Sequence, residues 1–213
     1  MARWDDLHRA IEAKESESAE RVWLELIETD SDAVDRFLDA SRTLAGKPGG
    51  KRQGGILLWM LAEALKEKGA DRELIAVLAQ LAGMGPDDGA VREGLVEAAR
   101  RACPDRADLD ALLEKSGVVG GSPEALAVQA RTLDTYLRLE PGTYVYHPAG
   151  WGTGRIVDYL PDRGRCVIDF EGKPGHEMDI DAAASRLERL AKDDIRAVAI
   201  SEPKRLRKWA NED

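Results

Sequence analysis

The chain contains the segment Pro141-Gly-Thr-Tyr-Val-Tyr-His-Pro-Ala-Gly-Trp-Gly-Thr-Gly-Arg-Ile-Val157, followed shortly by Arg165-Cys-Val-Ile-Asp-Phe170. Apolar and polar residues alternate on both sides of the glycine-rich turn, which is the period of a β-strand. The 140 residues before this segment have helical spacing of apolar residues instead. The change of period at Leu139-Glu-Pro141 predicts a domain boundary there.

The segment and the residues after it predict a compact β domain. Pro161-Asp-Arg-Gly164 suits a hairpin turn, and Asp181–Ser185 can form one helical turn before a final strand. The predicted strands are 143–147, 154–160, 165–170, 177–180 and 187–190. This order of strands and turns is the one that a small five-stranded SH3/Tudor-like β-barrel needs, and we place it at residues 139–192.

Residues 1–138 predict an all-α, repeat-like array of short helices with apolar stripes. Gln53–Lys68 is the most apolar of these helices and is expected to be central. Helix–loop–helix units of this size resemble helical solenoid repeats, although no repeat signature can be aligned. A tetratricopeptide-like array and an irregular one therefore both stay open.

The last residues, 193–213, predict a short helical segment. A helix over 193–200 is followed by a second one that holds a basic cluster, Lys204-Arg-Leu-Arg-Lys208. This second helix has little apolar surface where the sequence stops, so we expect a piece of a longer chain. The predicted fold class is α+β with several domains.

Charge disfavours direct nucleic-acid binding. The net charge is −9, and residues 1–140 hold 19 Lys and Arg against 27 Asp and Glu. A nucleic-acid-binding protein normally presents a basic face to the phosphates. A protein partner is favoured, and nucleic-acid binding is expected to be weak or absent.

No run of apolar residues approaches the length of a membrane span, and no secretory signal is evident. Cys103 and Cys166 lie far apart in the sequence and are expected to be reduced thiols. We therefore predict a cytoplasmic protein without a membrane partner.

No pattern in the sequence predicts catalysis or a cofactor. His8, His147 and His176 are scattered and have no Cys-x-x-Cys pair beside them, so a zinc site is not expected. Gly49-Gly-Lys-Arg-Gln-Gly-Gly55 lacks the spacing of a phosphate-binding loop, and a flexible loop between helices is expected there. The stretch is locally basic, since no acidic residue lies between Asp39 and Glu63, which leaves a weak contact with nucleic acid or an acidic protein as an alternative.

The turn residue Trp151 has two interpretations. Glycines on both sides leave its indole poorly covered, which suits an exposed anchor for a partner, but the indole can also fold back onto the barrel. His147 is expected to support the turn by a hydrogen bond, with a contact on the barrel rim as its alternative. The predicted partner-binding residues are Tyr144, Tyr146, His147, Trp151, Arg155 and Phe170.

Residues 140–157 resemble the CarD-type barrel of several bacterial transcription proteins, in which a Gly-x-x-Val-x-His opening and a Gly-x-Gly turn recur. The polymerase-interaction domain of transcription-repair coupling factors and the Tudor-like barrel of UvrD-type helicases look similar. The resemblance implies a module that docks on RNA polymerase.

A closer resemblance covers residues 139–213, through Gly150–Ile156, Val167–Phe170, Leu187–Leu190 and Ala199–Pro203. These segments look like the N-terminal extension of long Gre-type transcription elongation and cleavage factors of the planctomycete and chlamydial kind. Over residues 1–138 the resemblance is only architectural. The chain lacks the acidic-tipped coiled-coil hairpin through which Gre proteins act, so transcript cleavage cannot be assigned to these 213 residues.

Two functions follow from these observations. The first is a non-enzymatic module that docks on bacterial RNA polymerase through an exposed strand edge and aromatic anchors, with the acidic helices as a spacer or a second protein-binding surface. The alternative is a helical-repeat adaptor whose barrel is structural and has no role in transcription.

Overall fold

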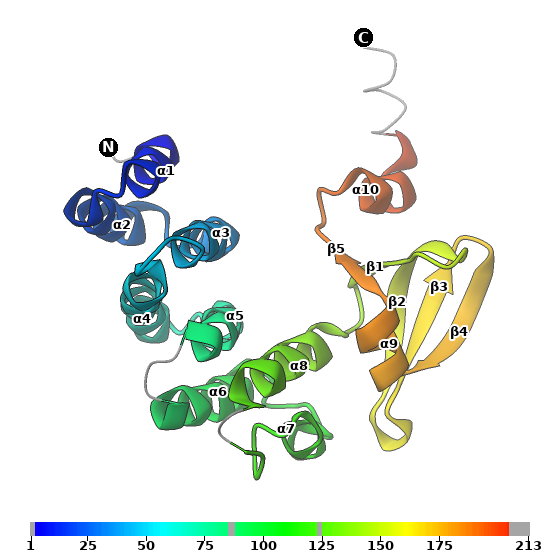
Figure 1. The fold of residues 1–213 in the computed structure, drawn as a ribbon. Coiled ribbons are helices and arrows are strands. Elements are labelled where there is room, and N and C mark those ends of the chain that lie inside the picture. Colours follow the sequence, from blue (N-terminus) through cyan, green and yellow to red (C-terminus); the bar gives the residue numbers. More distant parts are fainter. Residues whose placement is uncertain (1–2, 85–87, 123–124, 205–213) are drawn as a thin grey trace. The chain divides into compact units, whose positions relative to one another are not determined.

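The computed structural model describes residues 3–84, 88–122 and 125–204. The chain forms two compact units, Met1–Asp134 and Thr135–Asp213. Helices make up the first unit, and a five-stranded antiparallel sheet dominates the second (Figure 1). The α+β class and the order of helices before strands are therefore as the sequence predicts.

In the helical unit, each helix buries an apolar face against helices that are near it in the sequence. α1 packs on α2, α3 on α4, α4 on α5, and α5 on α6 (Figure 1). The largest buried side chains include Trp23, Phe37 and Leu61. The helices are α1 (Trp4–Ala13), α2 (Ser16–Asp30), α3 (Val34–Ala45), α4 (Gly50–Lys68), α5 (Asp71–Leu81), α6 (Asp88–Ala102), α7 (Leu109–Ser116) and α8 (Leu126–Arg138).

The start of α4 corrects the expectation of a flexible loop at Gly49–Gly55. The helix begins at Gly50, three residues before the predicted start, and Gly50, Gly54 and Gly55 are buried in its first turns. A Cβ atom on Gly50 would lie 1.9 Å from the carbonyl oxygen of Leu44, so only glycine fits this approach. Glycine has a low helix propensity, and close packing against α3 and the 3-10 turn η1 (Ala82–Met84) outweighs it.

The sheet has the strand order β4-β3-β2-β1-β5, with every neighbouring pair antiparallel. The third strand has the predicted bounds, and a helical turn precedes the last strand, as expected. The strands and the two helices of this unit are β1 (Tyr144–His147), β2 (Gly152–Leu160), β3 (Arg165–Phe170), β4 (Lys173–Asp179), α9 (Ile180–Arg186), β5 (Glu188–Leu190) and α10 (Ile195–Ser201).

β4 begins at Lys173, four residues earlier than the sequence predicts. Pro174 and Gly175 suggested a loop, since both are rare inside strands. β4 lies at one end of the sheet, where proline is tolerated because one side of the strand makes no ladder bonds.

One face of the sheet forms an apolar core. Val145 of β1, Ile156 of β2 and Ile168 of β3 are fully buried, and Phe170 covers Gly154. A register shift in β2 between Ile156 and Asp158 leaves Val157 43% exposed. This bulge changes which side chains of β2 point into the core.

The second unit includes the last turn of α8. The Tyr136 hydroxyl donates a hydrogen bond to Asp181 Oδ1 of α9 at 2.6 Å. Burial and the neighbouring Asp181 carboxylate raise the pKa of Tyr136. This bond connects the end of α8 to α9. The division of the chain into three domains, 1–138, 139–192 and 193–213, stays a prediction.

α10 confirms a helix close to the predicted 193–200. The basic cluster predicted at 204–208 lies outside the described residues from position 205 onward. In the described ranges, no helix combines the length and apolar character needed to cross a membrane.

We expect Gly154→Ala to destabilise the sheet unit by about 1–3 kcal/mol, the usual range for overpacking. The new Cβ would lie 2.7 Å from Phe170 Cδ1 and 3.0 Å from the carbonyl oxygen of Asp169. Urea unfolding, followed by circular dichroism, measures the change in the free energy of unfolding.

Gly172→Ala is the matched control, because a Cβ at Gly172 would meet no atom within 4 Å. An equal loss of stability in the two variants would contradict the close approach of β2 and β3 at Gly154.

Candidate interaction surface on the sheet

The turn between β1 and β2 holds Trp151 in a fixed place. Gly150 has φ +102° and Gly152 has φ +71°, values that residues with a Cβ rarely adopt. The two glycines reverse the chain within a few residues of His147, the last residue of β1. The turn therefore directs the Trp151 side chain back towards the sheet.

Trp151 is partly buried against three other rings. Its ring centroid lies 4.3 Å from that of His176, 4.5 Å from that of His147 and 5.6 Å from that of Phe170. The contacts with His176 and Phe170 are edge-to-face, a favourable arrangement for aromatic pairs. Of the two interpretations of Trp151, the structure shows the folded-back indole, with part of its surface still accessible.

A cation completes this group. The ammonium of Lys173 lies 4.5 Å from the Trp151 ring centroid, within the range of a cation–π contact. We call His147, Trp151, Phe170, Lys173 and His176 the Trp151 cluster. It joins the β1–β2 turn to β3 and β4.

The two histidines of the cluster differ in their surroundings. His147 is buried, and its Nδ1 accepts a hydrogen bond from the Ala149 backbone N–H at 3.2 Å, which is the turn-supporting role expected from the sequence. The pKa of His176 is lowered, chiefly by burial and further by Lys173 and His147. A neutral His176 therefore suits this cluster.

The cluster is continuous with the free edge of the sheet. In the part of the chain that the structure describes, β4 pairs only with β3, and most of its side chains are exposed. Lys173 and His176 both belong to β4 and both contact Trp151. An edge strand and a partly exposed indole thus lie next to each other, a combination suited to binding another protein.

Tyr144, Tyr146 and Arg155 form a separate group on the opposite face of the sheet. Tyr144 and Tyr146 alternate along β1 with the buried Val145 and His147. Arg155, which pairs with Tyr144 in the register of β1 and β2, lies 5.8 Å from the Tyr144 ring centroid. The six predicted residues therefore lie on two faces, with His147, Trp151 and Phe170 together on one of them.

Arg196 of α10 contacts Tyr146 and two carboxylates on the face of the sheet where Tyr146 lies. Its guanidinium lies 5.0 Å from the Tyr146 ring centroid and donates hydrogen bonds to Glu188 and Asp194, both at 2.8 Å. Hydrogen bonds from Arg196 lower the pKa of both carboxyl groups. Tyr146 is thus already engaged within the unit.

Sequence reasoning missed Lys173, His176 and Arg196. Lys173 and His176 lie in the first part of β4. Pro174 and Gly175 are typical of loops, so the sequence did not predict a strand there. Arg196 acts through a helix that follows the strands, and no local pattern places it beside Tyr146. Over residues 3–84, 88–122 and 125–204, no three His, Cys, Asp or Glu side chains are placed to hold a metal ion.

Comparison with known proteins finds similarity over nearly the whole chain. The chain is 28% identical over 198 residues to a protein named transcription elongation factor GreA, from Borreliella burgdorferi strain B31. The match covers 93% of this chain and 21% of that protein, so the chain spans about a fifth of the length of this relative. The similarity supports a relationship with a Gre-type factor. No family model matches the chain, and no solved structure gives a significant match.

We expect the stability of the sheet unit to fall as the pH drops below about 6.5, the ordinary pKa of histidine. The pKa of His176 is lowered in the folded chain, so the unfolded chain binds a proton at His176 more readily than the folded chain does. The loss of stability therefore continues until the pH falls below the pKa of His176 in the folded chain. His176→Gln removes this part of the pH dependence. Urea unfolding at several pH values between about 7.5 and 5 measures it.

His8→Gln, outside the cluster and in the helical unit, is the control for replacing a histidine elsewhere in the chain. A further loss of stability from about pH 4.5 downward belongs to Glu188 and Asp194, whose lowered pKa values act in the same direction. An unchanged pH profile in His176→Gln would contradict the role given to its neutral form.

Proposed function

We propose that this chain is a non-enzymatic module of a long Gre-type transcription elongation factor and that it docks on bacterial RNA polymerase through its sheet. The observation that carries the proposal is the 28% identity to a protein named GreA over 93% of the chain. Because the match covers 21% of that protein, most of the relative lies outside it, which fits a long Gre-type factor. The planctomycete or chlamydial kind of factor is part of the proposal. The role in elongation and a cytoplasmic location are proposed with it.

The sheet is proposed to be a CarD-type, SH3/Tudor-like barrel. Three features support this identity: β1 lies between β2 and β5, β2 is bent by a bulge, and the short α9 precedes the last strand. The Gly150-Trp-Gly152 turn with its positive φ values is a fourth.

Docking is proposed to occur by strand addition at the edge of β4. An extended segment of the polymerase would pair with backbone groups on the side of β4 that does not face β3. The C-terminal part of the strand is the better place, since Pro174 has no N–H and the Gly175 N–H donates a hydrogen bond to Asp169 Oδ1. Trp151 would provide the apolar anchor at the start of that edge, and Lys173 would attract an acidic side chain. This mode needs binding only, with no cofactor and no catalytic group.

The alternative function is a helical-repeat adaptor whose sheet is structural. The packing of α1–α6 against helices near them in the sequence and the net charge of −9 favour it, since both are compatible with a protein-binding array. The helices can serve as a spacer or a second protein-binding surface in either case. The two functions differ in whether the chain binds the polymerase, because the adaptor has no role in transcription.

Binding of the 213-residue chain to purified bacterial RNA polymerase core tests the proposal. We expect saturable binding in biolayer interferometry, and a loss of roughly thirtyfold in Trp151→Ala, as for an anchor residue worth about 2 kcal/mol. Lys173→Glu should also weaken binding, because it places a negative charge beside the Trp151 ring at the edge of β4.

Lys192→Glu is the matched control: it makes the same change at another exposed lysine, which follows β5 at the other end of the sheet. Circular dichroism shows whether each variant is folded. A folded wild-type chain that does not bind would favour the adaptor function. Binding that is equal in all variants would contradict docking through the Trp151 cluster and the edge of β4.

A further inference from the structure

An open groove lies on the helical unit beside α4. It has a volume of about 950 Å³, within the range of ligand-binding pockets. Its wall is mixed, with two cations at one end and apolar side chains along the rest. The lining residues are Gly49, Lys51, Arg52, Gly55, Ile56, Trp59, Met60 and Met84.

Apolar side chains remain accessible in this groove. Ile56 is 48% exposed, and Trp59 and Met60 are only partly buried. Gly55, whose Cβ position lies 3.6 Å from Met84 Cβ, leaves the wall open between α4 and η1. An accessible tryptophan, isoleucine and methionine on one helix face are typical of a protein-binding site.

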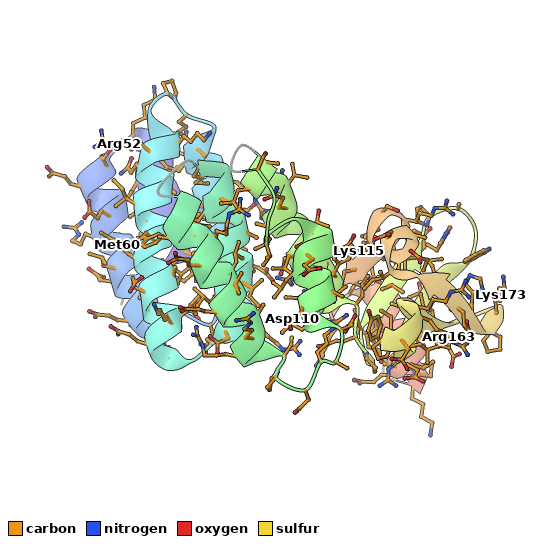
Figure 2. The ribbon with its side chains drawn as sticks, turned by 90° about the horizontal axis from the view of Figure 1, so that it is seen from below. Arg52, Met60, Asp110, Lys115, Arg163 and Lys173 are labelled. Carbon is orange, nitrogen blue, oxygen red and sulfur yellow. The ribbon has the colours of Figure 1, made fainter. Side chains whose placement is uncertain are left out.

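The groove has a helical geometry. Arg52, Ile56 and Met60 are spaced four residues apart, so they lie along one face of α4, and Figure 2 shows Arg52 and Met60 on the same side of the helix. They span about 12 Å along the axis, at 1.5 Å per residue. A partner helix of two to three turns would match this length.

Positive charges lie at one end of the groove and would orient a bound partner. Lys51 and Arg52 are exposed, and neither forms an ion pair with the residues that the structure describes. They belong to the first turn of α4, where the helix dipole adds positive charge. The segment between Asp39 and Glu63 contains no acidic residue, whereas residues 1–140 as a whole have a net charge of −8.

We infer that the α4 groove binds a short, acidic, amphipathic helix of a partner protein. The apolar face of that helix packs on Ile56, Trp59 and Met60, and its carboxylates lie next to Lys51 and Arg52. The accessible Ile56 and Met60 need an apolar face opposite them, which a phosphate backbone does not offer, so an amphipathic helix is a better match for this site than a nucleic acid. This inference concerns the helical unit and does not depend on polymerase docking by the sheet.

A fluorescein-labelled 14-residue peptide tests the inference in fluorescence anisotropy with the whole chain. The peptide has leucines at helical spacing and four glutamates at one end; a scrambled peptide of the same composition and a single-stranded oligothymidylate complete the set. We expect saturable binding of the amphipathic peptide only. Arg52→Glu should weaken it about fivefold and Ile56→Ser about tenfold, since each removes one of the two kinds of contact.

Two variants make the same changes elsewhere on the unit and should leave binding unchanged. Arg21→Glu reverses another exposed arginine, and Leu24→Ser truncates an apolar side chain of α2 that is 42% exposed. Absence of saturable peptide binding up to about 1 mM, or equal binding of the scrambled peptide, would overturn the inference.

Two other outcomes would assign the groove to a different occupant and also overturn the inference. Binding of the oligothymidylate that Arg52→Glu abolishes, without peptide binding, would make the groove a nucleic-acid site. Self-association of the chain in light scattering that Arg52→Glu removes would make a second copy the occupant.

Discussion

The packing of Trp151 against His147, Phe170 and His176 is the constraint on which the sheet surface depends. It holds the β1–β2 turn against β4, although the two segments are separated by β3 in the sheet. Each aromatic pair contributes about 0.5–1.5 kcal/mol beyond the area it buries, so the cluster is a substantial part of a small unit's stability. Without the positive φ values of Gly150 and Gly152, the indole could not return to the sheet.

The same contact explains how a structural side chain can also bind a partner. Trp151 is held in one orientation by rings on three sides, so it loses little conformational freedom when a partner covers its exposed part. Lys173 places a positive charge over the indole and at the first residue of the free edge. On the other face of the sheet, Arg196 contacts Tyr146, Glu188 and Asp194. These side chains already have partners within the unit, so this face is less suited to binding another protein.

Local patterns in the sequence predicted the order of helices and strands, the bounds of β3 and the tight turn around Trp151. These patterns did not predict the features that depend on tertiary packing. Gly50, Gly54 and Gly55 disfavour a helix locally, yet the approach of α4 to α3 and η1 needs their small size. The positions of Lys173 and His176 depend on β4 being an edge strand, which tolerates Pro174, and the residues of β4 alone do not reveal that.

The sheet surface and the α4 groove offer different chemistry. The sheet edge has backbone groups and an aromatic anchor, whereas the groove has a helical apolar stripe with cations at one end. They suit an extended segment and a helix, respectively. The acidic character of the remaining helical surface limits nucleic-acid contacts outside this small basic region.

Hydrogen exchange of the whole chain, alone and with RNA polymerase core, tests the central claim most directly. Strand addition predicts that the amides of β4 (Lys173–Asp179) that do not face β3 become protected on binding, together with those of the Gly150–Gly152 turn. Protection confined to the helices, with β4 unchanged, would contradict docking through the sheet.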